Sequence, residues 1–152
     1  MFYFLREDLE DLDIRIAELR SWLENTAQSI GQSAGGEGAW HDNFAFEEAH
    51  RQHSMHTKRL EELQKIRDQA QLVDPEVSTE AIAIGKTVTI IDEETDEARS
   101  FQIGSYMILD KHRTAVSYAA PLAQLIYGAR IGEVREGVIG GTLKRYKIIE
   151  IR

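Results

Sequence analysis

Residues 5–38 read LREDLEDLDIRIAELRSWLENTAQSIGQSAGGEG, and this stretch combines a heptad repeat with a glycine-rich break. The apolar residues recur at spacings of four and three, at Leu5, Leu9, Leu12, Ile16, Leu19 and Leu23, and then at Ile30. This spacing is typical of a helix that buries one seam against another helix. Charged residues fill the other positions, among them Glu7, Asp8, Glu10 and Arg15.

The glycine-rich break predicts a reversal of the chain. Four glycines lie between residues 31 and 38, and we expect them to end the first helix. A second helical pattern begins near residues 40–43, and its seam falls at Phe46, Ala49, His53, His56, Leu60, Leu63 and Ala70. Residues 1–74 therefore predict an antiparallel coiled-coil hairpin with its tip near residues 31–43. At about 1.5 Å per residue, helices of ~30 residues make an arm of roughly 45 Å.

The chain changes character after Asp74-Pro75, where short strand-like runs alternate with turn residues. We expect a short helix from Pro121 to Tyr127, ended by Gly128, and an acidic, solvated turn over residues 92–97. The expected strands cover residues 82–91, 100–104, 116–118, 133–138 and 142–151. Residues 75–152 thus predict a small antiparallel sheet with one helix packed on it, which makes the chain α+β.

Composition excludes several classes of function. The chain has 18 lysine and arginine residues against 26 aspartate and glutamate residues, a net charge of −8, so we expect no strong direct binding of nucleic acid. The absence of cysteine excludes a disulfide scaffold, a thiolate metal site and a cysteine nucleophile. No run approaches the roughly 20 apolar residues of a membrane span. No phosphate loop or nucleophile motif is present either, so we expect a cytoplasmic protein that is not itself an enzyme.

The segment 116–128 reads VSYAAPLAQLIYG, in which a strand meets a proline, a short apolar helix and a glycine. Together with Gly132-Glu133, the Gly140-Gly141 turn and the preceding hairpin, it resembles the GreA/GreB family of bacterial transcript-cleavage factors over nearly the whole chain. The resemblance implies an FKBP-like fold for residues 75–152. It also implies docking at the rim of the secondary channel of bacterial RNA polymerase, through Ala120, Pro121, Leu122, Gln124 and Leu125. Ala120 replaces the family's serine.

The same resemblance places the hairpin tip beside the polymerase active site. The family tip reads Gly-Asp-x-x-Glu-Asn, and here the implied tip residues are Glu37, Ala39, Trp40, His41, Asp42 and Asn43. In the family, two tip acids help to hold a second Mg²⁺ beside the polymerase's own, and two-metal chemistry needs that ion about 4 Å from the first. Ala39 replaces the first acid, and Asp42 stands where the second one is a longer glutamate. The implied Mg²⁺ ligands are thus Asp42 and Glu37, acting only with the polymerase metal, and we expect no intrinsic cofactor.

Two of these tip residues, and the neighbouring Phe44, also have simpler interpretations. Asp42 precedes a helical pattern, where aspartate is a favoured N-cap, and capping is compatible with a role at the tip. Trp40 and Phe44 close the hairpin by local packing, or they form an apolar probe that touches a partner.

Polar side chains on the second helix are also open to more than one interpretation. His50, His53 and His56 lie near one helical face at spacings of three. They set the register of the seam, respond to pH, or bind a metal ion. Arg20 and Arg51 are the basic residues nearest the tip, so the basic patch that contacts RNA in the family is thin here.

We therefore expect a monomeric factor that occupies the secondary channel, modulates elongation and meets DNA only indirectly, through polymerase. The replacement at Ala39 favours a regulator or inhibitor over an efficient cleavage factor. One alternative is a cleavage-stimulating factor that uses Asp42 and Glu37. A second is a coiled-coil interaction module unrelated to polymerase, in which the seam would form between chains.

Overall fold

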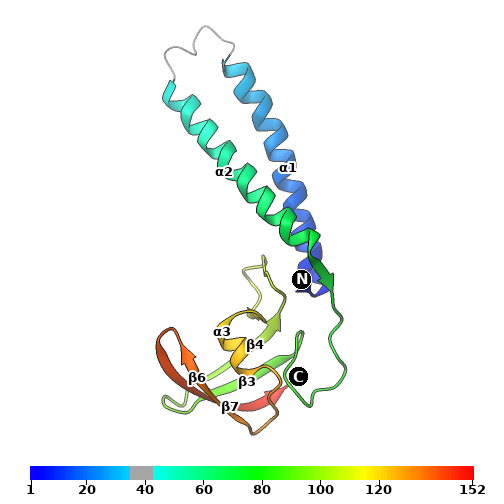
Figure 1. Ribbon diagram of the computed structural model, residues 1–152, viewed down its shortest axis with the longest axis vertical. Coiled ribbons are helices and arrows are strands. Elements are labelled where there is room, and N and C mark those ends of the chain that lie inside the picture. The colour runs from blue at the N-terminus through cyan, green and yellow to red at the C-terminus, as the bar shows by residue number, and fades with distance from the viewer. Residues whose placement is uncertain (35–42) are drawn as a thin grey trace. The chain divides into compact units, whose positions relative to one another are not determined.

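The computed structural model describes residues 1–34 and 43–152 (Figure 1). Its elements are β1 (Phe2–Phe4), α1 (Arg6–Ala34), α2 (Asn43–Asp68), β2 (Ala70–Leu72), β3 (Thr87–Asp92), β4 (Ala98–Gly104), β5 (Ala115–Ser117), α3 (Pro121–Ile126), β6 (Val134–Ile139) and β7 (Thr142–Ile151). Contacts group these elements into two compact units: Glu10–Gln69 forms one, and Met1–Leu9 together with Ala70–Arg152 forms the other. In the part of the chain that the structure describes, no helix is long and apolar enough to cross a membrane.

The first unit is the predicted hairpin, in which α1 and α2 lie side by side (Figure 1). Leu12, Ile16 and Leu63 are at most 6% exposed, and burying one leucine contributes about 1.5–3 kcal/mol. Between the helices, Arg67 Nε donates to Asp13 Oδ1 at 2.6 Å. The seam therefore forms within one chain, as the glycine-rich break predicts.

Two helix ends differ from the sequence-based expectation. α1 continues through Gly31 to Ala34, because one interior glycine costs only about 1 kcal/mol and does not end a helix of 29 residues. α2 ends at Asp68, so Ala70 lies in strand β2 and is not a seam residue. The expected seam position Ile30 falls among residues whose side chains lie outside the described part.

Sequence patterns missed the parallel pair of β1 and β2, which brings the two ends of the hairpin together. Phe2, Tyr3 and Phe4 pair with Ala70, Gln71 and Leu72. Phe4 is fully buried, and the Phe2 ring stacks on Tyr106 at a centroid distance of 4.0 Å. The run of three aromatic residues is the one local signal for β1, because aromatic side chains favour strands.

The second unit holds a five-stranded sheet in the order β5-β4-β3-β7-β6, with α3 on one face (Figure 1). Its core joins side chains of β3, β4 and β7 to α3, namely Val88, Ile90, Phe101, Ile103, Leu122, Ala123, Ile126, Tyr146 and Ile148. Gly140 and Gly141, with φ of 60° and 80°, make the two-residue turn of the last hairpin. The α+β architecture is confirmed, with one refinement: β5 runs parallel to β4, so the sheet is mixed.

The strand expected over residues 82–91 is shorter in the structure. It begins at Thr87, because Gly85 adopts a φ of +91° and its backbone lies against Pro75, where an added Cβ would be 2.7 Å from the ring. Ile82 is nevertheless in the core. The acidic turn is exposed as expected beyond Asp92, whose carboxylate accepts the N–H of Glu94 at 2.9 Å. That hydrogen bond is the main cause of the lowered pKa of Asp92.

A buried carboxylate joins the start of α1 to the sheet domain. Asp8 is 1% exposed, its Oδ1 accepts from Arg113 Nη1 at 2.5 Å, and its Oδ2 accepts from the Ser105 hydroxyl. Ser105 Oγ in turn accepts the N–H of Leu5 at 2.7 Å, and Arg113 Nη2 donates to Gln102 Oε1 at 2.6 Å. Asp8 is buried although it lies among the charged positions of the heptad pattern, because positions 5 and 8 share one helical face and Ser105 contacts both residues.

Removing the buried carboxylate should cost much more than removing an exposed one. We expect Asp8→Ala to lower the free energy of unfolding by about 3–5 kcal/mol, because Arg113 and Ser105 lose their partner. Arg113→Met should lower the free energy of unfolding less in the Asp8→Ala background than in the wild-type protein, since the two residues interact directly. Urea unfolding followed by circular dichroism measures both effects.

The matched control is Asp13→Ala, which removes a carboxylate from the half-exposed pair with Arg67 and should cost less than about 1 kcal/mol. Equal losses for Asp8→Ala and Asp13→Ala would contradict a structural role for the buried pair.

Candidate functional site

The hairpin tip is the first part of the candidate site. Of the tip residues expected from the sequence, Glu37, Ala39, Trp40, His41 and Asp42 lie outside the described residues, and Asn43 is the first residue of α2. Next to it, Phe44 is 82% exposed. Local packing therefore does not cover the Phe44 ring, which favours its interpretation as a contact residue.

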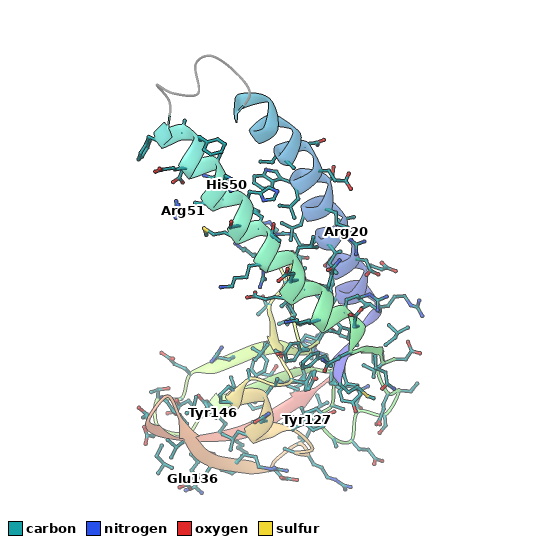
Figure 2. All side chains as sticks on the ribbon, turned by 45° about the horizontal axis from the view of Figure 1, so that its top comes forward. Arg20, His50, Arg51, Tyr127, Glu136 and Tyr146 are labelled. Atoms are coloured by element: carbon teal, nitrogen blue, oxygen red, sulfur yellow. The ribbon has the colours of Figure 1, made fainter. Side chains whose placement is uncertain are left out.

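The two basic residues nearest the tip are both engaged by neighbours. Arg20 lies on α1 and Arg51 on α2 (Figure 2). Arg51 donates to both carboxylate oxygens of Glu48, at 3.1 and 2.6 Å, and this hydrogen bonding is the main cause of the lowered pKa of the Glu48 carboxyl. The Arg20 guanidinium lies beside the amide of Gln64, whose oxygen accepts from it. The guanidinium groups of Arg20 and Arg51 are thus both hydrogen-bonded within the hairpin.

The histidines of α2 make packing contacts. The His56 ring stacks on Trp22 of α1 with centroids 4.1 Å apart, and its Nδ1 lies 2.7 Å from the carbonyl oxygen of Gln52. His50, labelled in Figure 2, meets the Phe46 ring edge-on at 5.2 Å. Within residues 1–34 and 43–152, no group of three or more His, Asp or Glu side chains is arranged to hold a metal ion. The geometry favours the seam-packing interpretation for His56.

The second part of the candidate site is the segment 119–125, which we call the docking segment. Pro121 occupies the first turn of α3, and Pro121 and Gln124 are exposed, whereas Leu122 is 8% exposed and belongs to the core. Leu125 packs on β6, where an added Cβ at Gly137 would lie 2.8 Å from its Cδ1. Of the five predicted docking residues, Pro121 and Gln124 are thus the most accessible, and Leu122 holds the helix from below.

Ala120 enters α3 in an extended conformation, with φ of −67° and ψ of 147°, and no side chain caps the helix. Its carbonyl oxygen accepts the N–H of Gln124 at 3.0 Å, and its own N–H donates to Ser117 at 3.0 Å. Tyr127, at the other end of α3, is 41% exposed (Figure 2). The docking segment therefore presents a proline and an amide on a short, packed helix, and Tyr127 lies exposed just beyond it.

Sequence reasoning missed two residues before this segment that make long-range contacts, Arg113 and Tyr118. Arg113 makes the buried pair with Asp8, and the Tyr118 hydroxyl accepts the N–H of Tyr3 at 3.1 Å. Both contacts join residues more than 100 positions apart. No local pattern in a single sequence carries that information.

Comparisons with known proteins identify the family of the chain. Residues 77–152 match the family described as "Transcription elongation factor, GreA/GreB, C-term". A transcription elongation factor GreA from Paracoccus denitrificans (strain Pd 1222) is 31% identical over 147 residues, which cover 97% of this chain and 94% of that protein. GreA from Rickettsia bellii (strain OSU 85-389) is 28% identical over 147 residues, covering 96% and 91%.

Solved structures with a similar course include GreA factor homolog 1 of Thermus thermophilus, with 21% identity, a TM-score of 0.46 and coverage of 99% of this chain and 97% of that one. GreA/GreB from Nitrosomonas europaea has 19% identity, a TM-score of 0.41 and coverage of 99% and 98%. The family match and the 31% identical relative identify the chain as a transcription elongation factor. The chain belongs to the GreA/GreB family, whose members are not enzymes themselves, and membership implies RNA polymerase as the partner.

The uncapped start of α3 yields a prediction. We expect Ala120→Ser to stabilise the protein by about 1 kcal/mol, because the extended backbone suits an N-cap and the new hydroxyl can accept the free N–H of Ala123. Thermal unfolding measures the gain. Ala119→Ser, one residue before the cap position, is the control, and an equal gain from both variants would contradict the capping explanation.

Proposed function

We propose that this protein enters the secondary channel of RNA polymerase in the cytoplasm and modulates elongation by occupying it. Family membership supports polymerase as the partner. The length of the hairpin supports entry into the channel, because α1 alone has 29 residues and a length of about 44 Å. The docking segment supports a rim contact, because it offers the exposed residues Pro121 and Gln124 on a packed helix, with Ala120 and Leu125 beside them.

The single observation that carries the regulatory side of this proposal is Ala39. Where the family has two tip acids, this chain keeps Asp42 alone. A methyl group cannot ligate Mg²⁺, which prefers several oxygen ligands, and one carboxylate holds a second divalent ion less well than two. The pairing of Arg51 with Glu48 points the same way, because it weakens the basic surface that would hold a displaced RNA end.

One alternative keeps a specific observation in its favour. Glu37 lies two residues before Ala39 and carries an oxygen ligand on a longer side chain. If Glu37 and Asp42 together hold Mg²⁺ with the polymerase, the protein stimulates transcript cleavage. The interaction-module alternative is disfavoured by membership of the GreA/GreB family. The burial of Leu12 and Leu63 in a hairpin of one chain is consistent with this choice.

The decisive experiment uses a polymerase stalled in a backtracked complex with saturating Mg²⁺. We expect the wild-type protein to leave the 3′ end of the RNA intact and to reduce the activity of an added GreA, because both occupy one channel. Ala39→Asp should gain cleavage of the RNA, since it restores the missing oxygen ligand. Gel electrophoresis of labelled RNA measures both.

Ala39→Asn is the matched control, because it has nearly the same shape as Ala39→Asp and lacks its charge. Shortening of the RNA by the wild type would establish the cleavage alternative, and Glu37→Gln would then abolish it. Neither shortening nor competition at tens of micromolar protein would overturn the polymerase proposal.

A further inference from the structure

Tyr118 joins the N-terminal strand to the residues that lead into the docking segment. Its hydroxyl accepts the N–H of Tyr3 at 3.1 Å, and the two rings lie 5.8 Å apart at an angle of 59°. Its own N–H donates to the carbonyl oxygen of Gly104 at 3.0 Å, at the end of β4. Tyr118 is therefore held from two sides, by β1 and by the sheet.

Arg113 makes a similar contact with the N-terminal residues at the opposite end of β5, just before the strand begins. This strand has only three residues and lies at the edge of the sheet, where β4 is its one neighbouring strand. Arg113 precedes it by two residues and binds the buried Asp8 carboxylate at 2.5 Å. Both ends of a short edge strand are thus tied to residues 2–8, which we call the N-terminal brace.

The turn after β5 transmits this placement to the docking segment. Ser117 Oγ accepts the N–H of Ala119 at 3.2 Å and donates to the carbonyl oxygen of Tyr106 at 3.0 Å. Tyr106 is itself fixed by the brace, because its N–H donates to the carbonyl oxygen of Tyr3 at 2.9 Å and its ring stacks on Phe2. Since no side chain caps α3, these turn bonds set the course of the backbone into Ala120.

We infer that the N-terminal brace sets the geometry of the polymerase-docking segment, with Tyr118 and Arg113 as positioning residues. The inference rests on the proposed function, because it assigns a support to the proposed docking segment. The brace belongs to the same compact unit as the sheet, so it reaches residues 119–125 without any contribution from residues 10–69. Residues at the start of the chain thereby determine a surface formed more than 110 positions later.

The test uses the full chain with Tyr118→Phe, which removes one hydroxyl and keeps the ring. Amide hydrogen exchange should accelerate at residues 118–120, because the turn loses its tie to Tyr3. Affinity for core RNA polymerase should fall about three- to tenfold, the equivalent of one hydrogen bond. Arg113→Met should produce the same two effects, and circular dichroism confirms that each variant is folded.

Tyr106→Phe is the matched control, since the Tyr106 hydroxyl makes no hydrogen bond within the described residues while its ring and backbone contacts remain. Unchanged exchange at residues 118–120 in Tyr118→Phe would overturn the inference. The inference would also be overturned if Tyr118→Phe showed faster exchange at these residues but bound polymerase as tightly as Tyr106→Phe does.

Gln124→Ala tests the proposed docking itself, because Gln124 is exposed on α3 and is not part of the N-terminal brace. It should weaken polymerase binding and leave exchange at residues 118–120 unchanged. A wild-type chain without affinity for polymerase would overturn the proposed function, a result that needs no variant. Pro121→Ala is a second variant of the same exposed surface. If it and Gln124→Ala both bind polymerase normally while Tyr118→Phe binds more weakly, the placement of the docking surface on α3 is overturned.

Discussion

The Asp8 carboxylate, buried between Arg113 and Ser105, is the constraint on which the sheet domain depends. A carboxylate without partners in such a site is strongly destabilising, whereas a well-bonded one contributes little net stability. The interaction therefore acts mainly by excluding other placements of the first turn of α1, since these would leave the carboxylate without its partners. The first turn of α1 has to meet the connection between β4 and β5 at one register, and Gln102 and Leu5 complete the hydrogen bonding around it.

That constraint explains why the chain does not divide at one point along its length. α1 is a continuous helix, yet Met1–Leu9 belongs to the compact unit of the sheet and Glu10–Gln69 forms the hairpin. The parallel pairing of β1 with β2 has the same consequence, because it groups the first residues of the chain with those that follow the hairpin. The domain boundary near residue 74 stays a prediction, which rests on the change of sequence pattern there. The two compact units are instead defined by contacts between residues, and they group residues 1–9 with residues 70–152.

In the proposed function, the residues that hold the fold differ from those that would act on the polymerase. The heptad seam and the sheet core hold the fold, and none of the implied tip residues occupies a heptad position of the sequence. On that proposal, Ala39 replaces an acid at a position outside the heptad pattern. The Arg51–Glu48 pair lies on the surface of α2, where both side chains are at least 39% exposed.

The sequence alone determined the hairpin, because a heptad seam needs only periodic apolar residues and a break, and both are local patterns. It determined the hairpin turns and α3 as well, through Gly140-Gly141 and through Pro121 with the apolar residues after it. It also carried the family resemblance and the replacement at Ala39. Only the tertiary structure decided the burial of Asp8, the pairing of β1 with β2 and the parallel course of β5. Each of these depends on partners distant in the chain, and a local pattern of charge or hydrophobicity cannot specify which distant residue will complete it.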